Sequence, residues 1–375
     1  PLAILINPIN SLHDIRALLD FAKNNGIQAV DFVSPVDRHL FRSQLDTPFE
    51  YKKCDDPRLL DQLNYSLCIG DVFTKHPVLS KHLLKSKYAF RSNALFCINP
   101  VLARTGWFAN INFENSPHSE PLYLGYIFKK IFKSKANKKS HPELELLYNL
   151  IKENLFDDKS LDISSEEKIY LDTVSDYLLS DNKFAIFYST HYYNVLGGYI
   201  NGILCTAISQ LTDSFFIPLY ADSNFNAIVD LSQNIYPELH IGYQPLLHYV
   251  MNDEFNFTWA IGWNPETYIP GNQKFPTEMN WIISSMVQDE FPNNIKVLLP
   301  EAHIYEQMDL RTNFLSWQSI GSPAVKKPIG SAQTNAHFTY LFQQQLSDKK
   351  ISLQTESQKS HEKNWENNLT QELSN

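Results

Sequence analysis

The stretch from Tyr65 to Asn99 decides the fold class: YSLCIG (Tyr65–Gly70) is followed by PVLSKHLLKSKY (Pro77–Tyr88) and then by ALFCIN (Ala94–Asn99). The first and last runs are short and apolar, and the middle one has apolar residues at helical spacing. Strand, helix and strand with short connections are typical of a parallel sheet covered by helices. The same order precedes it, from the strand Leu2–Pro8 through the helix Leu12–Asn25 to the strand Ile27–Val33.

Further along, helical patterns and then strands follow. We expect a first α/β lobe over 1–113, a helical connection over 114–182, a second α/β lobe over 183–346 and a polar tail over 347–375. The connection has helical runs at Leu122–Phe132, Leu144–Leu155 and Glu167–Leu179. The second lobe has strand-like runs at Phe184–Tyr188, Phe215–Leu219, Thr258–Gly262, Trp281–Ser285 and Ile295–Leu299, with a helix from Gly197 to Leu211. We expect the tail to lie along a neighbouring subunit, with Trp365 as its anchor.

Composition excludes several classes of protein. The 375 residues carry 32 Lys and Arg against 41 Asp and Glu, a net charge of −9, which disfavours nucleic acid as a partner. No apolar run is long enough to span a membrane. Only 12 residues are Gly and no G-x-G-x-x-G occurs, which disfavours nucleotide or pterin binding. Four scattered cysteines fit neither an iron–sulfur cluster nor structural zinc, and we expect no disulfide. Cys68, Cys97 and Cys205 lie in apolar segments, so we expect these three to be buried and free.

Four stretches together resemble the molybdopterin oxidoreductases. They contain a strand ending in Gly, a His-Pro-Val helix start, a Gly-x-Asn-Pro turn, and Leu-Pro, Glu, Asn and Pro-Gly landmarks in order. The residues are Leu67–Asp71, His76–Leu79, Leu95–Pro100, Trp259–Pro265, Trp281–Ile283, Ile295–Pro300, Glu306, Asn313 and Pro328–Gly330. The resemblance implies a molybdopterin-oxidoreductase-like α/β fold, with two Rossmann-like parallel-sheet lobes, a helical segment between them and a polar C-terminal tail.

Over residues 1–345 the succession most resembles the C-terminal half of the large iron–sulfur (75 kDa) subunit of respiratory complex I. This resemblance implies a structural, cofactor-free domain of NADH:ubiquinone oxidoreductase that supports electron transfer from NADH to quinone. The partners would be other peripheral-arm subunits, above all the chain carrying the iron–sulfur half, without nucleic acid and without a direct membrane span. The location would be the matrix side of the mitochondrial inner membrane, or the cytoplasmic face of a bacterial one. Because Pro1 is not an encoded start, we expect the chain to be processed or to lack its first residues.

Two alternatives share the fold. One is a metal-free scaffold subunit similar to those of formylmethanofuran dehydrogenase or formyltransferase/hydrolase complexes. The other is an active molybdopterin oxidoreductase with a pterin–metal site.

Departures from the family pattern lead us to expect no catalytic, cofactor-binding or metal-binding residue. Asp309 stands at the first Gly of the last signature, and Ser316 and Trp317 stand where Gly-Arg is usual, while Glu306 and Asn313 persist. Trp263 follows Gly262 where a phosphate would need to approach, which predicts a site filled by protein.

Other polar groups have both a functional and an ordinary interpretation. His191 beside Ser189 and Thr190 suggests nucleophile chemistry, but no G-x-S-x-G turn accompanies it, so a hydrogen-bonded loop histidine is favoured. Glu301 and Glu306 stand close to His303, as an acid–base pair would, although the sequence shows no opposing environments for them. His240 and His248 could ligate a metal, but their spacing disfavours it. The Lys-rich run Lys129–Lys139 could contact acidic surfaces or lipid headgroups, although a solvated linker is the default interpretation.

Overall fold

A computed structural model describes residues 2–54, 56–135, 141–155, 163–180, 182–191, 197–239, 241, 250, 255–263, 279–286, 295–303, 306, 309–312, 318–321, 332–349 and 365–374. The chain divides into two compact units, each built from two separate segments. Unit 1 comprises Pro1–Pro35 and Asp222–Glu362, and unit 2 comprises Val36–Ala221 and Lys363–Asn375. Within the described residues, no helix combines the length and the apolar character that a bilayer crossing requires.

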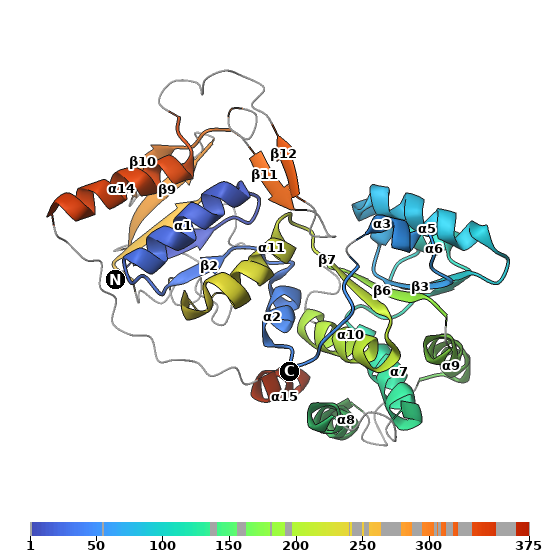
Figure 1. Ribbon diagram of the computed structural model, residues 1–375. Helices are drawn as coiled ribbons and strands as arrows, with labels where there is room; N and C mark the ends of the chain where they lie inside the picture. Colours follow the sequence, from blue (N-terminus) through green and yellow to red (C-terminus); the bar gives the residue numbers. More distant parts are fainter. Residues whose placement is uncertain are drawn as a thin grey trace. The chain divides into compact units, whose positions relative to one another are not determined.

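Unit 1 is a five-stranded parallel sheet in the order β10-β9-β8-β1-β2, with helices on it (Figure 1). Its strands are β1 (Leu2–Ile6), β2 (Val30–Phe32), β8 (Phe257–Ile261), β9 (Asn280–Ser285) and β10 (Ile295–Pro300). A separate antiparallel pair consists of β11 (Asp309–Thr312) and β12 (Gln318–Gly321). The helices are α1 (Leu12–Asn24), α11 (Phe225–Asp230) with the turns η1 (Leu231–Ile235) and η2 (Pro237–Leu239), and α14 (Asn335–Lys349).

Aromatic rings fix both faces of this sheet. On one face, Trp259 of β8 meets Phe21 of α1 at 6.1 Å and Phe342 of α14 at 5.3 Å between ring centroids, so both helices cover that face. On the other face, Trp281 packs edge-on against Trp263 at 6.3 Å within a fully buried cluster. Because a sheet with parallel strands is buried on both sides, apolar rings are needed on each.

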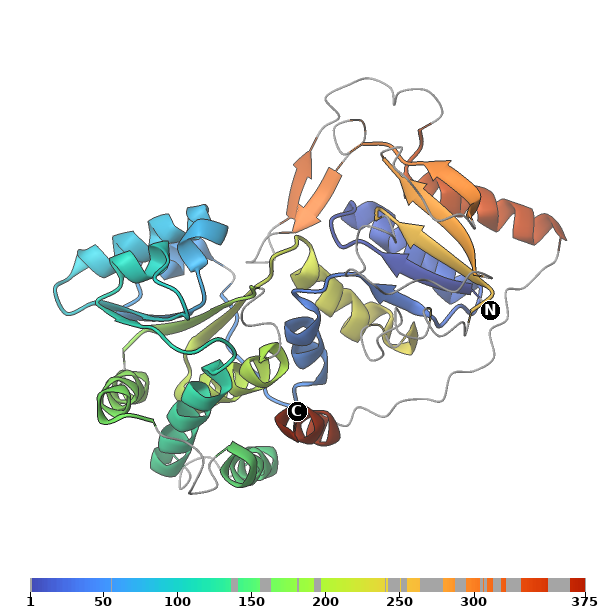
Figure 2. The ribbon, with the colours of Figure 1, turned by 180° about the vertical axis from the view of Figure 1, so that it is seen from behind.

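Unit 2 is a second five-stranded parallel sheet, in the order β5-β4-β3-β6-β7 (Figures 1 and 2). Its strands are β3 (Tyr65–Ile69), β4 (Ala94–Ile98), β5 (Ile111–Phe113), β6 (Phe184–Ser189) and β7 (Phe215–Leu219). Figure 1 shows α3 (Pro57–Leu60), α5 (Pro77–Ala89) and α6 (Arg104–Phe108) on one face, and α7 (Glu120–Lys135), α9 (Ser165–Leu179) and α10 (Gly198–Thr212) on the other. The remaining helices are α2 (Arg38–Asp46), α4 (Val72–Lys75), α8 (Pro142–Leu155) and α15 (Trp365–Ser374).

The α/β class and the two parallel-sheet lobes expected from the sequence are confirmed, but the lobes are assembled differently from the linear division. The first two strands pair with strands after residue 256, while β3, β4 and β5 pair with β6 and β7. Residues 114–182 do not link two lobes. They lie between β5 and β6 in the sequence, and their helices α7 and α9 cover one face of the unit 2 sheet. Apolar runs reveal strands but not their partners, because pairing is decided by long-range packing.

The C-terminal helix also differs from the expectation of a tail on a neighbouring subunit. Helix α15 packs against α8 and α10 of its own unit. Leu369 is fully buried there, and the Asn368 side-chain amide donates to the Asp46 carboxylate over 2.9 Å. Tyr199 donates to the same carboxylate over 3.0 Å, and Arg42 lies 3.5 Å from it. Burial raises the pKa of Asp46, although these three partners oppose the shift.

Helices α2 and α10 approach closely because α10 has glycine where the two meet. A Cβ on Gly202 would stand 1.9 Å from Oγ and 2.7 Å from Cβ of Ser43, which is buried on α2. A Cβ on Gly198, one turn earlier, would stand 3.1 Å from Cβ of His39. The absence of a side chain at residue 202 therefore sets the distance between the two helices.

We predict that Gly202→Ala destabilises the protein by about 1–3 kcal/mol, because the new methyl group overpacks the α2–α10 contact. Helix propensity alone would shift stability the other way, by roughly 1 kcal/mol in favour of Ala. Urea denaturation measures the change. The double substitution Ser43→Gly with Gly202→Ala moves the side chain to the other helix and should recover most of the loss. A stabilised Gly202→Ala protein would contradict the packing described here.

Candidate functional site

Each sheet has one place where the order of its strands reverses. In unit 1 the chain runs outward from β1 to β2 and then from β8 to β10 on the other side, so the reversal lies between β1 and β8. In unit 2 it lies between β3 and β6. In open parallel sheets, ligands bind in the crevice beyond the carboxyl ends of the strands at such a reversal. These two strand ends are therefore the candidate sites.

In unit 1 the reversal is closed by side-chain amides. Asn7, directly after β1, donates from Nδ2 to the carbonyl oxygen of Gly262 over 2.8 Å. Asn10 donates from Nδ2 to the carbonyl oxygens of Asn7 over 2.9 Å and Ile261 over 3.3 Å. The two turns that border the crevice are thus bonded to each other across 250 residues of sequence.

Gly262 is essential to this closure. Its φ is +71°, a conformation that side chains disfavour, and a Cβ there would lie 2.6 Å from Nδ2 of Asn10. The space beside the glycine, which a ligand phosphate would need, is therefore taken by Asn10.

A third amide secures the same loop. Asn224, with φ of +69°, donates from Nδ2 to the carbonyl oxygens of Pro8 over 2.9 Å and Asn10 over 2.8 Å. It is buried, as is Asn10. These amides occupy backbone carbonyls that would otherwise be open to a ligand or to water.

Trp263 lies elsewhere than the sequence interpretation placed it. Its ring packs into the core cluster under the sheet, 3% exposed, and its indole N–H donates to the carbonyl oxygen of Leu5 over 2.9 Å. The obstacle at the turn is Asn10, which the sequence analysis did not single out. Asn10 comes two residues after Pro8, just beyond the first strand, and Asn is so common in loops that its presence there was no reason to expect this role for it.

In unit 2 the corresponding strand ends have charged and titratable groups. β3 ends at Gly70, with φ of +85°, followed by Asp71. The Asp71 carboxylate accepts a hydrogen bond from the Thr105 hydroxyl over 2.8 Å, and the same hydroxyl accepts from the backbone N–H of Phe73 over 2.8 Å. Asp71 thereby fastens α4 to the start of α6.

Two histidines lie in the field of Asp71 and Lys75. Burial is the largest cause lowering the pKa of His76, to about 4; Lys75 lowers it further, and Asp71 opposes the shift. The same causes, in the same order, lower the pKa of His191, which follows β6. Both imidazoles are therefore neutral near pH 7, where each ring has one donor and one acceptor nitrogen. The parallel register of β3 and β6 brings these groups to one edge.

The neighbours of His191 do not form a nucleophile. The Thr190 hydroxyl donates to the buried Asp37 carboxylate, which also accepts from the backbone N–H of Ala221 over 2.8 Å. Ser189 is buried. Thr190 thus joins the ends of β6 and β7 to the start of α2, and the hydroxyl is not presented to a substrate.

Glu301, Glu306 and His303 do not form an acid–base pair. The Glu306 carboxylate accepts from the backbone N–H of His303 over 2.9 Å. Glu301 is buried and accepts from Nδ2 of Asn335 over 2.7 Å, while its second oxygen has no hydrogen-bond partner among the described residues. Burial, reinforced by the negative charge of Asp14, raises the pKa of Glu301 to about 8.

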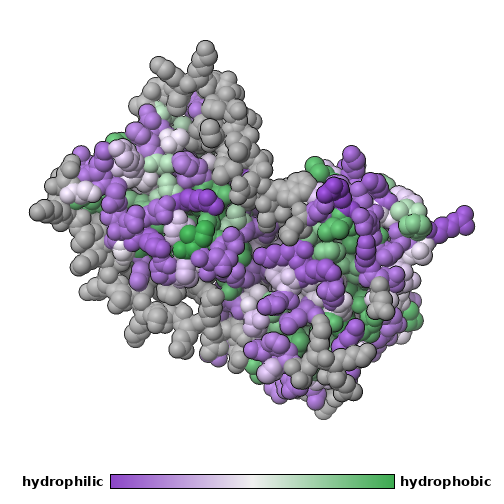
Figure 3. All heavy atoms as spheres, in the orientation of Figure 1, coloured by the Kyte–Doolittle hydropathy of each residue, from purple (hydrophilic) through white to green (hydrophobic). Residues whose placement is uncertain are grey.

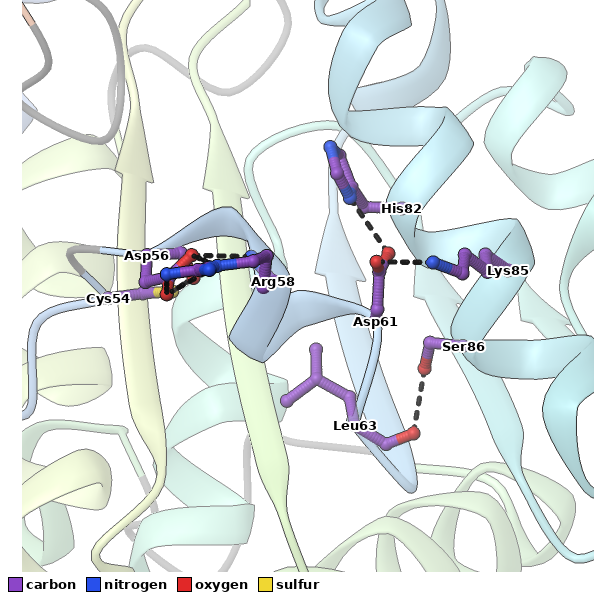
Figure 4. Close-up of polar contacts among 8 residues, drawn as sticks. All are labelled: Cys54, Asp56, Arg58, Asp61, Leu63, His82, Lys85 and Ser86. Atoms are coloured by element: carbon purple, nitrogen blue, oxygen red, sulfur yellow. Dashed lines mark hydrogen bonds and ion pairs between the residues drawn. The ribbon is translucent and has the colours of Figure 1, made fainter.

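The structure also reveals a polar cluster that the sequence did not indicate (Figure 4). Asp61, just after α3, lies between two side chains of α5: Nδ1 of His82 at 2.8 Å and Nζ of Lys85 at 2.7 Å. Burial acts to raise the pKa of Asp61, but the hydrogen bonds from Lys85 and His82 outweigh it and lower the pKa. This cluster joins α3 to α5, and the Ser86 hydroxyl adds a bond to the Leu63 carbonyl over 2.7 Å.

The prediction for Cys68, Cys97 and Cys205 is confirmed, since all three are buried and free, and Cys54 is buried and free as well. Burial raises the pKa of Cys97 to about 12 and that of Cys68 well above its ordinary value. Among the residues that the structure covers, no group of three His, Cys, Asp or Glu side chains could hold a metal ion. Several predicted positions lie outside the described residues: His240, His248, Asn264, Pro265, Asn313, Ser316, Trp317, Pro328–Gly330 and residues 136–139.

Comparison with known proteins identifies the fold. No protein-family profile matches the sequence, and no curated protein matches it. Among solved structures, the chain is similar to one from the formyltransferase/hydrolase complex (FhcABCD) of Methylorubrum extorquens, solved with methylofuran. The TM-score is 0.60 at 12% identity, over 94% of this chain and 93% of that one. It is also similar to the acetylene hydratase of Pelobacter acetylenicus, with a TM-score of 0.61 at 12% identity, over 90% of this chain and 54% of that one. The protein has a molybdopterin-oxidoreductase-like fold.

The resemblance to complex I is wrong. Both structural neighbours point to other molybdopterin-type proteins, and neither supports a respiratory-chain function, peripheral-arm partners or a mitochondrial location. The motifs that suggested complex I lie at strand ends and turns of this fold, such as the turn at Gly70 after β3, and a fold does not by itself imply a function.

The residues of unit 1 do not fit the pterin that this fold holds in its active members. The turn at Gly262 has Asn10 against its Cα, and the carbonyls of Gly262, Ile261 and Asn7 are bonded to side-chain amides. A pterin phosphate at this turn would require Asn10 to leave and these carbonyls to lose their partners.

We predict that Glu301→Gln flattens the dependence of stability on pH. Since the pKa of Glu301 is raised in the folded state, the native protein holds a proton that the unfolded chain releases, so stability falls as pH rises from about 4.5 through 8. Glutamine is neutral throughout and keeps the acceptor for Asn335. At pH 8 the variant should be more stable, by on the order of 3 kcal/mol, with little difference at pH 5.

Thermal unfolding between pH 5 and 8.5 measures this effect. Glu50→Gln, the same substitution at an exposed position, is the matched control. A Glu301→Gln protein that loses stability at pH 8 would show that the buried carboxylate is needed in its charged form.

Proposed function

We propose that this chain is a catalytically inactive, molybdopterin-oxidoreductase-like subunit that serves as a scaffold in a multi-subunit complex acting on one-carbon formyl groups. One observation carries the proposal. The similarity to the chain from the formyltransferase/hydrolase complex extends over nearly the whole of both chains, 94% and 93%. The match to acetylene hydratase leaves almost half of that enzyme without a counterpart.

The closed turn of unit 1 supports the absence of pterin chemistry in this subunit. Asn10 and Asn7 use their amides to satisfy the carbonyls around Gly262, and Asn224 holds the same loop from a third position. All three side chains are buried. Buried amides that donate to backbone carbonyls stabilise the fold, and the Nδ2 donors of these three residues are used within the protein.

An active molybdopterin oxidoreductase is the less favoured reading for the same reason. Such an enzyme needs backbone and small side chains next to its cofactor, whereas a Cβ-sized volume beside Gly262 is already filled here. The charged groups beyond β3 do not provide such a cofactor site in unit 2, because the Asp71 carboxylate already accepts a hydrogen bond from the Thr105 hydroxyl.

The proposal predicts the composition of the native assembly. When the tagged full-length chain is purified from the cells that produce it, native mass spectrometry should show it in a hetero-oligomer of fixed stoichiometry. Elemental analysis should find molybdenum and tungsten well below one atom per copy of this chain. Oxidative release of pterin, read by fluorescence, should give no signal in proportion to this chain.

Two results would contradict the proposal. Recovery of the chain as a lone monomer would exclude the scaffold function. Stoichiometric pterin with molybdenum or tungsten, lost on exchange of Gly262 for a larger residue, would show that the chain is an enzyme. As a matched substitution, Gly26→Ala also replaces a glycine of positive φ, 67°, in a turn with no atom within 4 Å of the added methyl group.

A further inference from the structure

One segment of unit 2 is basic although the protein is acidic. Between Val72 and Phe113, which includes α4, α5, β4, α6 and β5, there are six Lys and Arg residues and no Asp or Glu. The whole chain has a net charge of −9. The six cations are Lys75, Lys81, Lys85, Lys87, Arg91 and Arg104. Such separation of charge on one side of a unit gives that side a positive potential.

The same segment exposes large hydrophobic side chains. Trp107, Val78 and Phe90 are 67%, 66% and 69% exposed. Seven such residues fall in this segment: Val78, Tyr88, Phe90, Val101, Leu102, Trp107 and Ile111. We call these residues, with the six cations, the α5–α6 face. Figure 3 shows hydrophobic residues lying among strongly hydrophilic ones on this unit. Large hydrophobic side chains exposed in number on neighbouring elements, and not scattered singly, mark interaction sites.

The α5–α6 face is held rigidly. Helix α6 is attached to both α4 and α5. The Thr105 hydroxyl accepts from the backbone N–H of Phe73 on α4, and the ring of Phe108, the last residue of α6, lies 5.8 Å from the ring of Phe73. The carbonyl oxygen of Phe108 also accepts from Nζ of Lys87 on α5. Helices attached to one another in this way present a preformed surface, which reduces the ordering cost of binding.

Four of the cations are available to a partner. Lys85 is paired with Asp61 at 2.7 Å (Figure 4). Nζ of Lys87 donates to the carbonyl oxygen of Phe108 and lies over the ring of Tyr88. Lys75, Lys81, Arg91 and Arg104 are exposed and make no ion pair with the part of the chain that the structure describes. The face therefore presents exposed apolar side chains together with four cations that are available to a partner.

We propose that the α5–α6 face binds a partner subunit through an apolar patch rimmed by Asp and Glu. The inference rests on the proposed function, since it names the surface by which the scaffold joins its complex. Exposed Trp, aromatic residues and Arg are enriched in protein interfaces. Aliphatic side chains such as Val78, Val101 and Leu102 gain from burial under apolar protein surface, and not from contact with phosphate groups.

A second copy of this chain is not the occupant. A twofold contact of this face with itself would oppose its four available cations to the same four, and like charges across an interface are repulsive. A basic face on an acidic chain instead favours binding to a different protein, one whose contact surface carries Asp and Glu.

Zero-length carbodiimide coupling on the native assembly tests this directly, because the reagent joins lysine amines to carboxylates in ion-pair contact. Lys75 or Lys81 should be coupled to Asp or Glu of one different subunit present in fixed stoichiometry. The coupling should decline at 0.5 M salt, where the Debye length is only about 4 Å.

Two matched pairs of variants separate a binding role from a general effect. Trp107→Ser with Leu102→Ser removes two exposed apolar side chains of the face, and Ile169→Ser changes a residue of α9 that is as exposed as Trp107, at 67%. Lys81→Glu reverses a charge on the face, and Lys168→Glu does so on α9. The face variants should reduce recovery of the coupled subunit by about tenfold or more, and the α9 variants should not. Unchanged circular dichroism in all four confirms folding.

Failure of this inference differs from failure of the scaffold function. A chain that purifies alone contradicts both. A chain that stays in its complex, with Lys75 and Lys81 uncoupled or the face variants recovered like the controls, contradicts only the inference. Coupling to a second copy, or binding of poly(U) RNA or phosphatidylserine vesicles that the face variants abolish, would assign the face to another occupant and overturn it.

Discussion

The bonds between the two turns of unit 1, formed by the amides of Asn7 and Asn10, determine what that unit can do. They connect the end of β1 to the end of β8, which are neighbours in the sheet and far apart in the sequence. Only glycine at residue 262 allows both the backbone conformation and the approach of Asn10. The space beside Gly262, at the strand ends where parallel sheets commonly bind ligands, is therefore taken by the Asn10 side chain.

The strand ends of unit 2 lie at the same kind of strand-order reversal as those of unit 1, but different side chains occupy them. Asp71 is used as a link between helices, and His76 and His191 are kept neutral mainly by burial. Hydroxyls that sequence alone might assign to catalysis, such as Thr190, are bonded to a buried carboxylate. In both units, then, polar groups at the strand ends hold the fold together. What remains distinctive on the outside of unit 2 is the α5–α6 face, where charge and apolar area coincide.

The sequence predicted much of the fold because parallel strands buried on both faces appear as short apolar runs, as in Tyr65–Ile69 and Ala94–Ile98. It did not predict which strands pair, since β1 joins β8 through contacts 250 residues apart. From the sequence we expected the Trp263 ring to fill the space beside Gly262, but this ring packs in the core. The side chain that lies beside Gly262 is that of Asn10, which no sequence pattern indicated. The Asp61–His82–Lys85 cluster was missed because its members are separated by 21 and 24 residues. The respiratory-chain function was wrongly inferred from motifs at strand ends and turns, because a fold does not by itself imply a function.

The most direct test of this account is an experimental structure of the assembled protein at a resolution that shows the side chains around Gly262. The account predicts density for the Asn10 amide within hydrogen-bond distance of the carbonyls of Asn7 and Ile261, with only protein at the turn. Density for a pterin phosphate against Gly262, with Asn10 turned away, would contradict it.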